Sequence, residues 1–407
     1  MVWKKGFAII LGLLTVISLM PFISAQEGNN IVILVSDNEA DSAVAENVGG
    51  LLGAQIVTTT WGLYDPQISA QIIEKEPDLV IIIGGEVAVP EEYEEDLDDM
   101  EIEVIRWAGK NREETSLDVI KGMKEYFPNI LEQVDELYLI DGREAVSYKT
   151  IKLIKEYEGS PSQILIAFVN YNSKDFEEQL EEVIHTAEAE NIVLPVLMYG
   201  RNNVFSGHSK TMELALQYGQ SSGVSLSIIN ISLKEDYVLE VIHLAENRIL
   251  EAKDTLDGLE EPKAKAMIKL AEKEIEEARD AYDKGDYQKA YIKAMTAKGH
   301  AEIALRSSNE MLRGIFQGSM GFALEHQLTR LKWMMIGLRN TGVDVGEIEQ
   351  LLNSAELALK QHKYDEAQEI IEDIKEKLKE SFKYKKEKSE EHMPVTPPKP
   401  GDRKEKP

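Results

Sequence analysis

The stretch VIRWAGKNREETS, residues 104–116, gathers cationic side chains in a chain whose net charge is −28. Arg106 and Arg112 lie on either side of Gly109, and Thr115 follows where a helix is expected to begin. A guanidinium group matches the oxygens of carboxylates and phosphates, because its planar donors can bind two oxygens at once. The stretch therefore predicts ion pairing rather than bond breaking, either with an anionic ligand or with acidic side chains of the same chain.

Two other sets of residues could meet this stretch in space. Gly84 and Gly85 follow a strongly apolar run, at the end of a predicted strand where α/β sheets bind ligands. Backbone amides at such a turn and at the next helix start can hold an anion. Asp37, Asp41 and Glu86 could instead pair with the arginines and hold loops together. The residues therefore predict either ligand binding or loop bracing, and one arginine could brace while the other binds.

The remaining chemistry-bearing residues do not form a recognisable catalytic or metal-binding pattern. The seven histidines include no pair at metal-ligand spacing, and neither a nucleophile elbow nor a phosphate-binding loop is present. His208, near Ser206 and Ser209, is expected to be a surface loop residue. The acidic run at 91–103 lacks the central glycine of a calcium loop and predicts a solvated helix face. We therefore expect no catalytic residues, no metal site and no cofactor.

Composition narrows the class of protein and of partner. The 407 residues suffice for two or three domains, and 43% hydrophobic residues support sizeable cores. With 45 Lys and Arg against 73 Asp and Glu, nucleic acid is excluded as an expected partner, since phosphate neutralisation needs clustered positive charge. The absence of cysteine excludes disulfides and thiolate metal sites.

The first 25 residues predict a secretory signal peptide. Lys4 and Lys5 precede a long apolar run, Pro21 breaks it, and Ala25 offers a small residue for cleavage before Gln26. The alternative is an uncleaved membrane anchor, which would be the chain's only contact with a membrane. Either outcome predicts a protein that is secreted or held at the cell surface.

From residue 26 to 233 the chain predicts an α/β region, a parallel sheet with flanking helices. Short apolar runs alternate with amphipathic stretches, and the halves at 31–128 and 134–232 could be two similar modules. The expected strands are at 31–36, 55–60, 78–85, 101–108, 135–142, 163–170, 192–199 and 224–231, with helices between them, including ones around 145–157 and 208–218.

Residues 234–382 predict an all-α helical bundle of five or six helices. Two segments, 278–290 and 355–367, align without gaps and each places a tyrosine nine residues after an alanine, as in a helical hairpin.

The Met-rich stretch at 308–340 predicts a buried helix or a partner-binding face. Residues 383–407, charged and then proline-rich, predict a disordered tail.

Three pieces of residues 31–128 together resemble the cell-wall-binding repeat type 2 family of secreted prokaryotic proteins. They are VSDNEADSAVA (35–45), LVIIIGGEVAVPEEYEEDL (79–97) and VIRWAGKNREETSLDVI (104–120), the last with the Arg-x-x-Gly-x-x-Arg-x-x-Thr spacing of Arg106, Gly109, Arg112 and Thr115. The resemblance implies tandem modules that attach surface proteins to anionic wall polymers. This chain shows one clear copy, so a fuller assembly would need a homo-oligomer.

Three functions follow as hypotheses. The first is an exported, non-enzymatic surface protein whose α/β region binds an anionic envelope polymer or a surface-layer component, with the helices as spacer or partner platform. The second is an interaction protein whose helical region binds a protein partner. The third is a secreted hydrolase or transferase.

Overall fold

The structure, a computed structural model, describes most of the chain after the signal-like segment. The described residues are 30–141, 164–170, 175–189, 191–199, 203–204, 224–232, 235–256, 260–316 and 320–391. The signal segment at 1–25, the helices expected around 145–157 and 208–218, and His208 lie outside them. No helix of the described ranges is both long and apolar enough to cross a membrane.

The first module is a four-stranded parallel sheet in the order β2-β1-β3-β4. Side-chain caps fix where its helices begin: Asn38 accepts from the Ala40 amide, Asp65 from Gln67 and Asn111 from Glu114. The elements are β1 (Ile31–Ser36), α2 (Glu39–Leu52), β2 (Gln55–Thr59), α3 (Pro66–Glu74), β3 (Leu79–Ile83), α4 (Glu92–Asp99), β4 (Glu103–Trp107) and α5 (Arg112–Tyr126).

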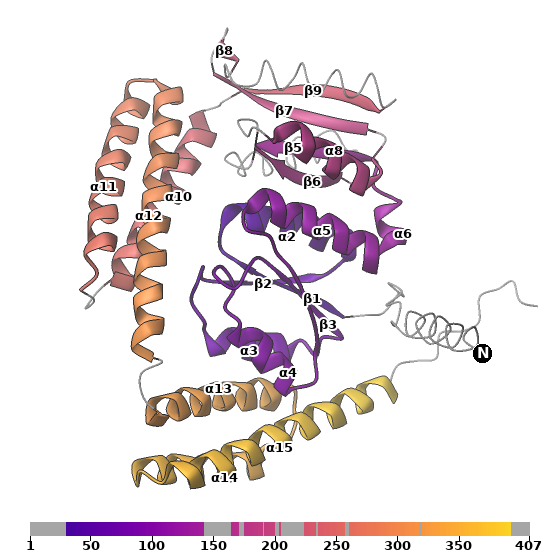
Figure 1. Cartoon of the computed structure of the whole chain (residues 1–407), viewed down its shortest axis with the longest axis vertical. Helices are drawn as coiled ribbons and strands as arrows, with labels where there is room; N and C mark the ends of the chain where they lie inside the picture. The colour runs from indigo at the N-terminus through magenta and orange to yellow at the C-terminus, as the bar shows by residue number, and fades with distance from the viewer. Residues whose placement is uncertain are drawn as a thin grey trace, which may run out of the picture.

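The central strands β1 and β3 are buried along their whole length, so the sheet needs cover on both faces. Successive side chains point to opposite faces. Ile33 and Ile81 face the core that contains α2 and α5, whereas Leu34 and Ile82 face the core that contains α3 and α4. Figure 1 shows these two helix layers on either side of the sheet.

The second module repeats the strand order of the first. Its parallel strands run β6-β5-β7-β9, which corresponds to β2-β1-β3-β4, and the short β8 pairs antiparallel with β7. Its described elements are α6 (Pro128–Leu131), β5 (Glu136–Asp141), β6 (Ile164–Val169), α8 (Phe176–Ala187), β7 (Asn191–Tyr199), β8 (Asn203–Val204) and β9 (Ser225–Ser232). The predicted parallel α/β region with flanking helices is therefore confirmed, and its two sheets have the same order of parallel strands within the described residues.

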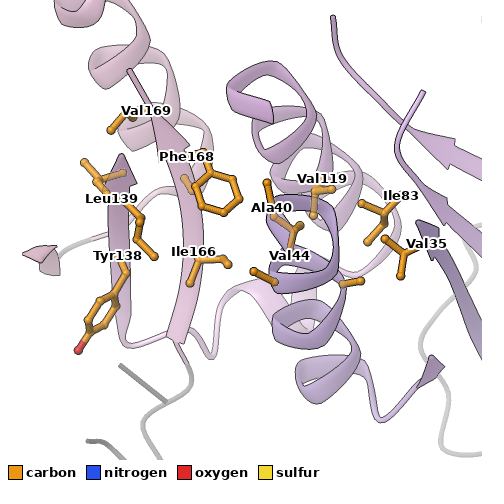
Figure 2. Close-up of a cluster of buried hydrophobic side chains, with 14 of the residues drawn as sticks. Val35, Ala40, Val44, Ile83, Val119, Tyr138, Leu139, Ile166, Phe168 and Val169 are labelled. Carbon is orange, nitrogen blue, oxygen red and sulfur yellow. The ribbon is translucent and has the colours of Figure 1, made fainter. Parts of the chain in front are cut away.

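The two sheets share one helix layer, formed by α2 and α5. Figure 2 shows Val44 and Val119 of these helices between Val35 and Ile83 of the first sheet and Ile166 of the second. Side chains of this layer also form hydrogen bonds with the backbone amides and a carbonyl of β6, an edge strand of the second sheet. Asn47 donates to the Ile164 carbonyl at 2.8 Å and accepts from the Ile166 amide, while the Ser116 hydroxyl accepts from the Phe168 amide at 2.9 Å. Covering an edge in this way prevents unwanted strand pairing.

The predicted all-α region is confirmed, but the six helices that the structure describes in it form two groups of three rather than one bundle. The helices are α10 (Glu235–Leu256), α11 (Pro262–Asp283), α12 (Tyr287–Phe316), α13 (Met320–Asn340), α14 (Gly346–Lys360) and α15 (Tyr364–Glu391). The group α10–α12 stands beside the two modules, and the group α13–α15 lies under α3 and α4 (Figure 1). Helix α15 continues past the tail boundary predicted at residue 382, because Phe382 is buried and Lys385 and Lys386 pair with Glu76 and Asp78.

The repeated sequence segments are the turns of two helical hairpins. Tyr287 begins α12 and Tyr364 begins α15, each after a tight turn from the preceding helix. Alanines of both segments are fully buried, which lets the paired helices approach closely. Each group therefore consists of one leading helix followed by a hairpin of similar construction.

Helix α13 is fixed to the first module by apolar packing and by a buried ion pair. Met334 and Leu338 join the core beneath α3 and α4. Arg330, which is 9% exposed, donates to the fully buried Asp96 through Nε at 2.8 Å. The prediction that the Met-rich stretch contains a buried helix is therefore confirmed for the face of α13 that packs against the first module.

Close packing of α13 on α3 should make Gly337 intolerant of any side chain. A Cβ at this position would lie 2.7 Å from the Ala70 carbonyl oxygen. We expect Gly337→Ala to lower the free energy of unfolding by about 1–3 kcal/mol, the usual cost of overpacking. Gly299→Ala is the matched control, since a Cβ there meets nothing within 4 Å and alanine favours a helix. Urea unfolding of the two variants measures the difference, and equal stability would contradict this packing.

Candidate functional site

The predicted site residues gather at the carboxyl edge of the first sheet. Asp37 and Asp41 follow β1, Gly84 and Gly85 follow β3, and Gly109, Arg112 and Thr115 follow β4. Because the strands are parallel, these loops emerge at the same edge. The structure thus brings the predicted residues together, and hydrogen bonds show how Arg106, Thr115 and Asp37 are used.

Arg106 braces the loop between β3 and α4. Its Nη1 donates to the carbonyl of Gly84 at 2.7 Å and to that of Val89 at 3.1 Å, and its Nε donates to Glu94 at 3.0 Å. The side chain is only 14% exposed. Gly84 has a φ of +117°, which favours glycine, and its carbonyl is held by this arginine. The geometry of Arg106 is that of an internal brace.

Gly109 and Thr115 form the turn that starts α5. The Thr115 hydroxyl, which is buried, accepts from the Gly109 amide at 3.0 Å. A Cβ at Gly109 would lie 2.2 Å from the Glu114 Cβ, so only glycine lets the loop pass this close to the helix. The Ala108 amide donates to Asp118 at 2.9 Å. The spacing of glycine and threonine in the motif is therefore explained by the turn itself.

Asp41 lies within electrostatic reach of Arg112 at the edge of the sheet. Burial raises the pKa of Asp41 to about 6, although the charge of Arg112 and a hydrogen bond from Ser36 oppose the shift. Glu302, on α12, adds to the rise through its like charge. Asp41 also lies beside the second predicted element, because its Oδ2 would be 3.4 Å from a Cβ at Gly84. The pKa of this carboxyl group is thus raised above that of an ordinary aspartate.

Asp37 pairs with a residue that the sequence analysis did not connect with it. Arg248 of α10, 7% exposed, donates to the Asp37 carboxylate at 2.8 Å and to its backbone carbonyl at 2.9 Å. The other Asp37 oxygen accepts from the Trp61 amide. A signal for Arg248 was present in the sequence, because it occupies a position on the apolar stripe of its helix, between Ala245 and Ala252.

Helices α10 and α12 cover the carboxyl edge, where α/β sheets bind ligands. Arg306 of α12 lies over the ring of Trp61 at 6.0 Å. Burial would raise the pKa of Glu302, but Lys298, Arg248 and Arg112 lower it overall, so Glu302 is a carboxylate surrounded by cations. The edge is thus occupied by protein side chains from two distant segments.

A cavity of about 440 Å³ lies beside this edge, between α5 and α8. Its lining is dominated by carboxylates, with Lys121 as the one cation, so it does not match an anionic ligand. Lys121 is paired with Glu182 at 2.8 Å. No group of three or more potential metal ligands occurs within the described ranges.

Comparison with known proteins gives a partial relative and a low-scoring match among solved structures. No family model matches the chain. The uncharacterized protein MJ0755 of Methanocaldococcus jannaschii is 39% identical over 127 residues, which are 31% of this chain and 36% of that protein. The chain thus spans about a third of the length of this curated relative.

Among solved structures, Cwp6 from Clostridium difficile matches with a TM-score of 0.36 and 19% sequence identity. The match covers 51% of this chain and 30% of Cwp6. At this TM-score the likeness decides neither the fold nor the function. Membership of the cell-wall-binding repeat type 2 family therefore stays a prediction.

Removal of Arg106 should destabilise the fold. Arg106→Ala would leave two carbonyls and Glu94 without their charged donor, and we expect a loss of about 2–3 kcal/mol in the free energy of unfolding. Lys110→Ala is the control, because Lys110 is an exposed cation of the same stretch and its loss should change stability by less than about 0.5 kcal/mol. Chemical unfolding measures both, and an Arg106→Ala variant as stable as Lys110→Ala would contradict the bracing role.

Neutralisation of Asp41 should stabilise the protein above pH 6. An aspartate whose pKa is raised in the folded state costs stability when ionised, and this cost disappears as the pH falls toward its unfolded value of 3.8. We expect Asp41→Asn to gain up to about 3 kcal/mol at pH 7.5 and about half of that at pH 5. Unfolding curves across this range test the sign, and a variant less stable than the parent at pH 7.5 would refute it.

Proposed function

We propose that this chain is a non-enzymatic interaction protein, acting outside the cytoplasm, whose helical region binds a protein partner while the α/β modules serve as its scaffold. The observation that carries the proposal is the internal use of the predicted anion-binding residues. Arg106 is bonded to Gly84, Val89 and Glu94, and Asp37 is bonded to Arg248. The location outside the cytoplasm rests on the signal-like N-terminal sequence.

The surface best suited to a partner is the groove between α13 and α14, about 530 Å³ in volume. Its apolar lining comes from Leu328, Trp333, Ile336 and Leu359. Its charged lining consists of two glutamates and two lysines, with the ion pair Lys332–Glu356 at 3.6 Å. We call these lining residues the α13–α14 groove.

Charge selects the class of partner for this groove. The chain as a whole carries −28, so its surface repels an anionic polymer. The α13–α14 groove is instead balanced in charge and partly apolar, and it contains a tryptophan, a residue type enriched at binding hot spots. These properties fit a protein segment that inserts apolar side chains between the two helices.

Attachment to an anionic envelope polymer or surface-layer component through the α/β region is a second candidate. The shared strand order of the two modules favours it, since the family resemblance implies tandem modules of one construction. Arg112, which is half-buried beside the covered edge, and the exposed Lys110 are the cations of this stretch that such a polymer would meet. A homo-oligomer would add further modules to the assembly.

Binding to isolated envelopes of the source organism should depend on the groove. We expect Trp333→Ser to weaken binding at least tenfold, whereas Leu357→Ser, an exposed apolar residue of α14 outside the groove lining, should have no effect. Protease treatment of the envelopes should abolish binding by the parent chain. Circular dichroism of each variant checks that folding is intact.

Two outcomes would overturn this proposal. Binding that survives protease treatment, falls with salt and is lost in Arg112→Ser would support the polymer candidate instead. A chain that self-associates in sedimentation, and becomes a monomer on Trp333→Ser, would assign the groove to a second copy of the same chain.

A further inference from the structure

The last turns of α15 differ from the rest of the helix in what holds them. Ile374, Leu378 and Phe382 are buried in the core that α15 shares with the first module. After Phe382 the helix continues as KYKKEKSEE, and Tyr384, its one aromatic residue, is 60% exposed. None of the described side chains after Phe382 belongs to that core. We call residues 383–391 the α15 clasp.

Two lysines of the α15 clasp pair with the loop between α3 and β3. The Nζ of Lys386 lies 2.9 Å from the carboxylate of Asp78, and the Nζ of Lys385 lies 3.4 Å from that of Glu76. Lys385 also donates to the carbonyl of Thr341, just after α13, at 3.0 Å. The side chains of the two ion pairs are between 28% and 35% exposed, so salt reaches them.

The loop that receives these lysines also fixes the entry of the chain into β1. The Asp78 carboxylate accepts from the amide of Asn30 at 2.9 Å, and the Asp78 amide donates to the Asn30 carbonyl at 2.9 Å. The side chain of Asn30 donates to the carbonyl of Glu76 at 3.2 Å. The α15 clasp therefore closes on the place where the N-terminal segment joins the first sheet.

The backbone of Glu76 indicates that this residue serves the pairing rather than the turn. Its φ of +49° lies in the left-handed region, which favours glycine. Its amide donates to the carbonyl of Ile73 as the chain leaves α3. A strained conformation persists where the surrounding interactions need that residue. The ion pair with Lys385 is an interaction that a glycine at this turn could not make.

The turn after α4 has the same feature and supplies an internal comparison. Glu101 has a φ of +54° and pairs with Lys379 of α15 at 2.7 Å. Asp99, before the same turn, pairs with Lys375 at 3.3 Å. Both of these lysines precede Phe382 and lie where the apolar core fixes α15. Two strained glutamates thus contact the same helix, one in its core-fixed part and one in the α15 clasp.

We propose that the α15 clasp is a salt-sensitive strap. The ion pairs with Glu76 and Asp78 hold it closed at low ionic strength, and screening of these pairs releases residues 383–391 from the first module. The rest of α15 stays in place, because its apolar side chains remain in the core. In the released form the predicted tail begins at residue 383, where the sequence alone places it, and its reach grows by about 28 Å when extended.

Screening sets the size of the effect. Partly exposed ion pairs contribute little each, and the Debye length falls from about 10 Å at 0.1 M salt to about 3 Å at 1 M. The helix itself adds little resistance, since Glu390 and Glu391 place negative charge at its C-terminal end, against the helix dipole. We expect the ratio of released to closed molecules to rise about three- to tenfold between 0.1 M and 1 M salt.

Distances between spin labels test the strap directly, since the chain has no native cysteine. Cysteines replacing the exposed Gln71 of α3 and Glu387 of the α15 clasp report on the strap. A second pair, at Gln71 and the exposed Glu372, reports on the core-fixed part of α15. Pulsed electron paramagnetic resonance of the full chain is recorded at 0.1 M and 1 M sodium chloride. A longer-distance population should grow with salt in the first pair, and the second pair should not change.

Glu76→Gly and Glu101→Gly are the deciding variants. Each removes one ion pair with α15 and relieves one left-handed glutamate, so both should fold. We expect Glu76→Gly to show the longer distance at 0.1 M salt already, whereas Glu101→Gly should behave as the parent does.

Three results would overturn the proposal. The first is a Gln71–Glu387 distance that does not respond to salt in the parent. The second is identical behaviour of Glu76→Gly and Glu101→Gly, since the pair at Glu76 would then have no special role. The third is lengthening of both label pairs together, which would mean that the whole of α15 leaves the core.

Discussion

A parallel sheet whose central strands are apolar on both faces must be covered on both, and the rest of this structure follows from how the first sheet is covered. Strands β1 and β3 have no exposed residue on either side. Helices α2 and α5 cover one face and then serve a second sheet on their outer side. Helices α3 and α4 cover the other face, and α13–α15 complete that layer from below. What remains is the carboxyl edge of the first sheet, where Arg248 of α10 bonds to Asp37 and Arg306 of α12 lies over the ring of Trp61.

The strands and helices of the α/β region could be predicted because their causes are local. Apolar runs mark β1 and β3, and Asn38, Asp65 and Asn111 act as caps within a few residues of the helices they begin. The turn geometry of Gly109 and Thr115 is local too.

The boundary of the C-terminal tail was predicted wrongly for the opposite reason. The last turns of α15 depend on Glu76 and Asp78, about 300 residues earlier in the chain, and no local pattern contains that information.

The sequence predicted which residues form the candidate site but not which partners they bond to. The sequence indicated that Asp37, Asp41 and the arginines would lie at one edge, and it left open whether they bind a ligand or brace loops. Arg106 braces, through partners 12 to 22 residues away. The partner of Asp37 is 211 residues away, on a helix that the sequence assigned to a separate region. From sequence, such a pair can be detected only through the arginine, because a charged residue on the apolar stripe of a helix predicts that it has a buried partner. The sequence does not indicate which acidic residue is that partner.

The two helical groups show one construction used twice. Each begins with a helix that places a buried arginine against the first module, Arg248 against Asp37 and Arg330 against Asp96. Buried ion pairs add specificity of placement more readily than net stability, because desolvation offsets their attraction. Around Arg330 the apolar core supplies the stability, and the ion pair only orients the helix. Around Arg248 the apolar residues of α10 likewise belong to the core that contains α2 and α5, so this ion pair too fixes the position of its helix rather than supplying the stability.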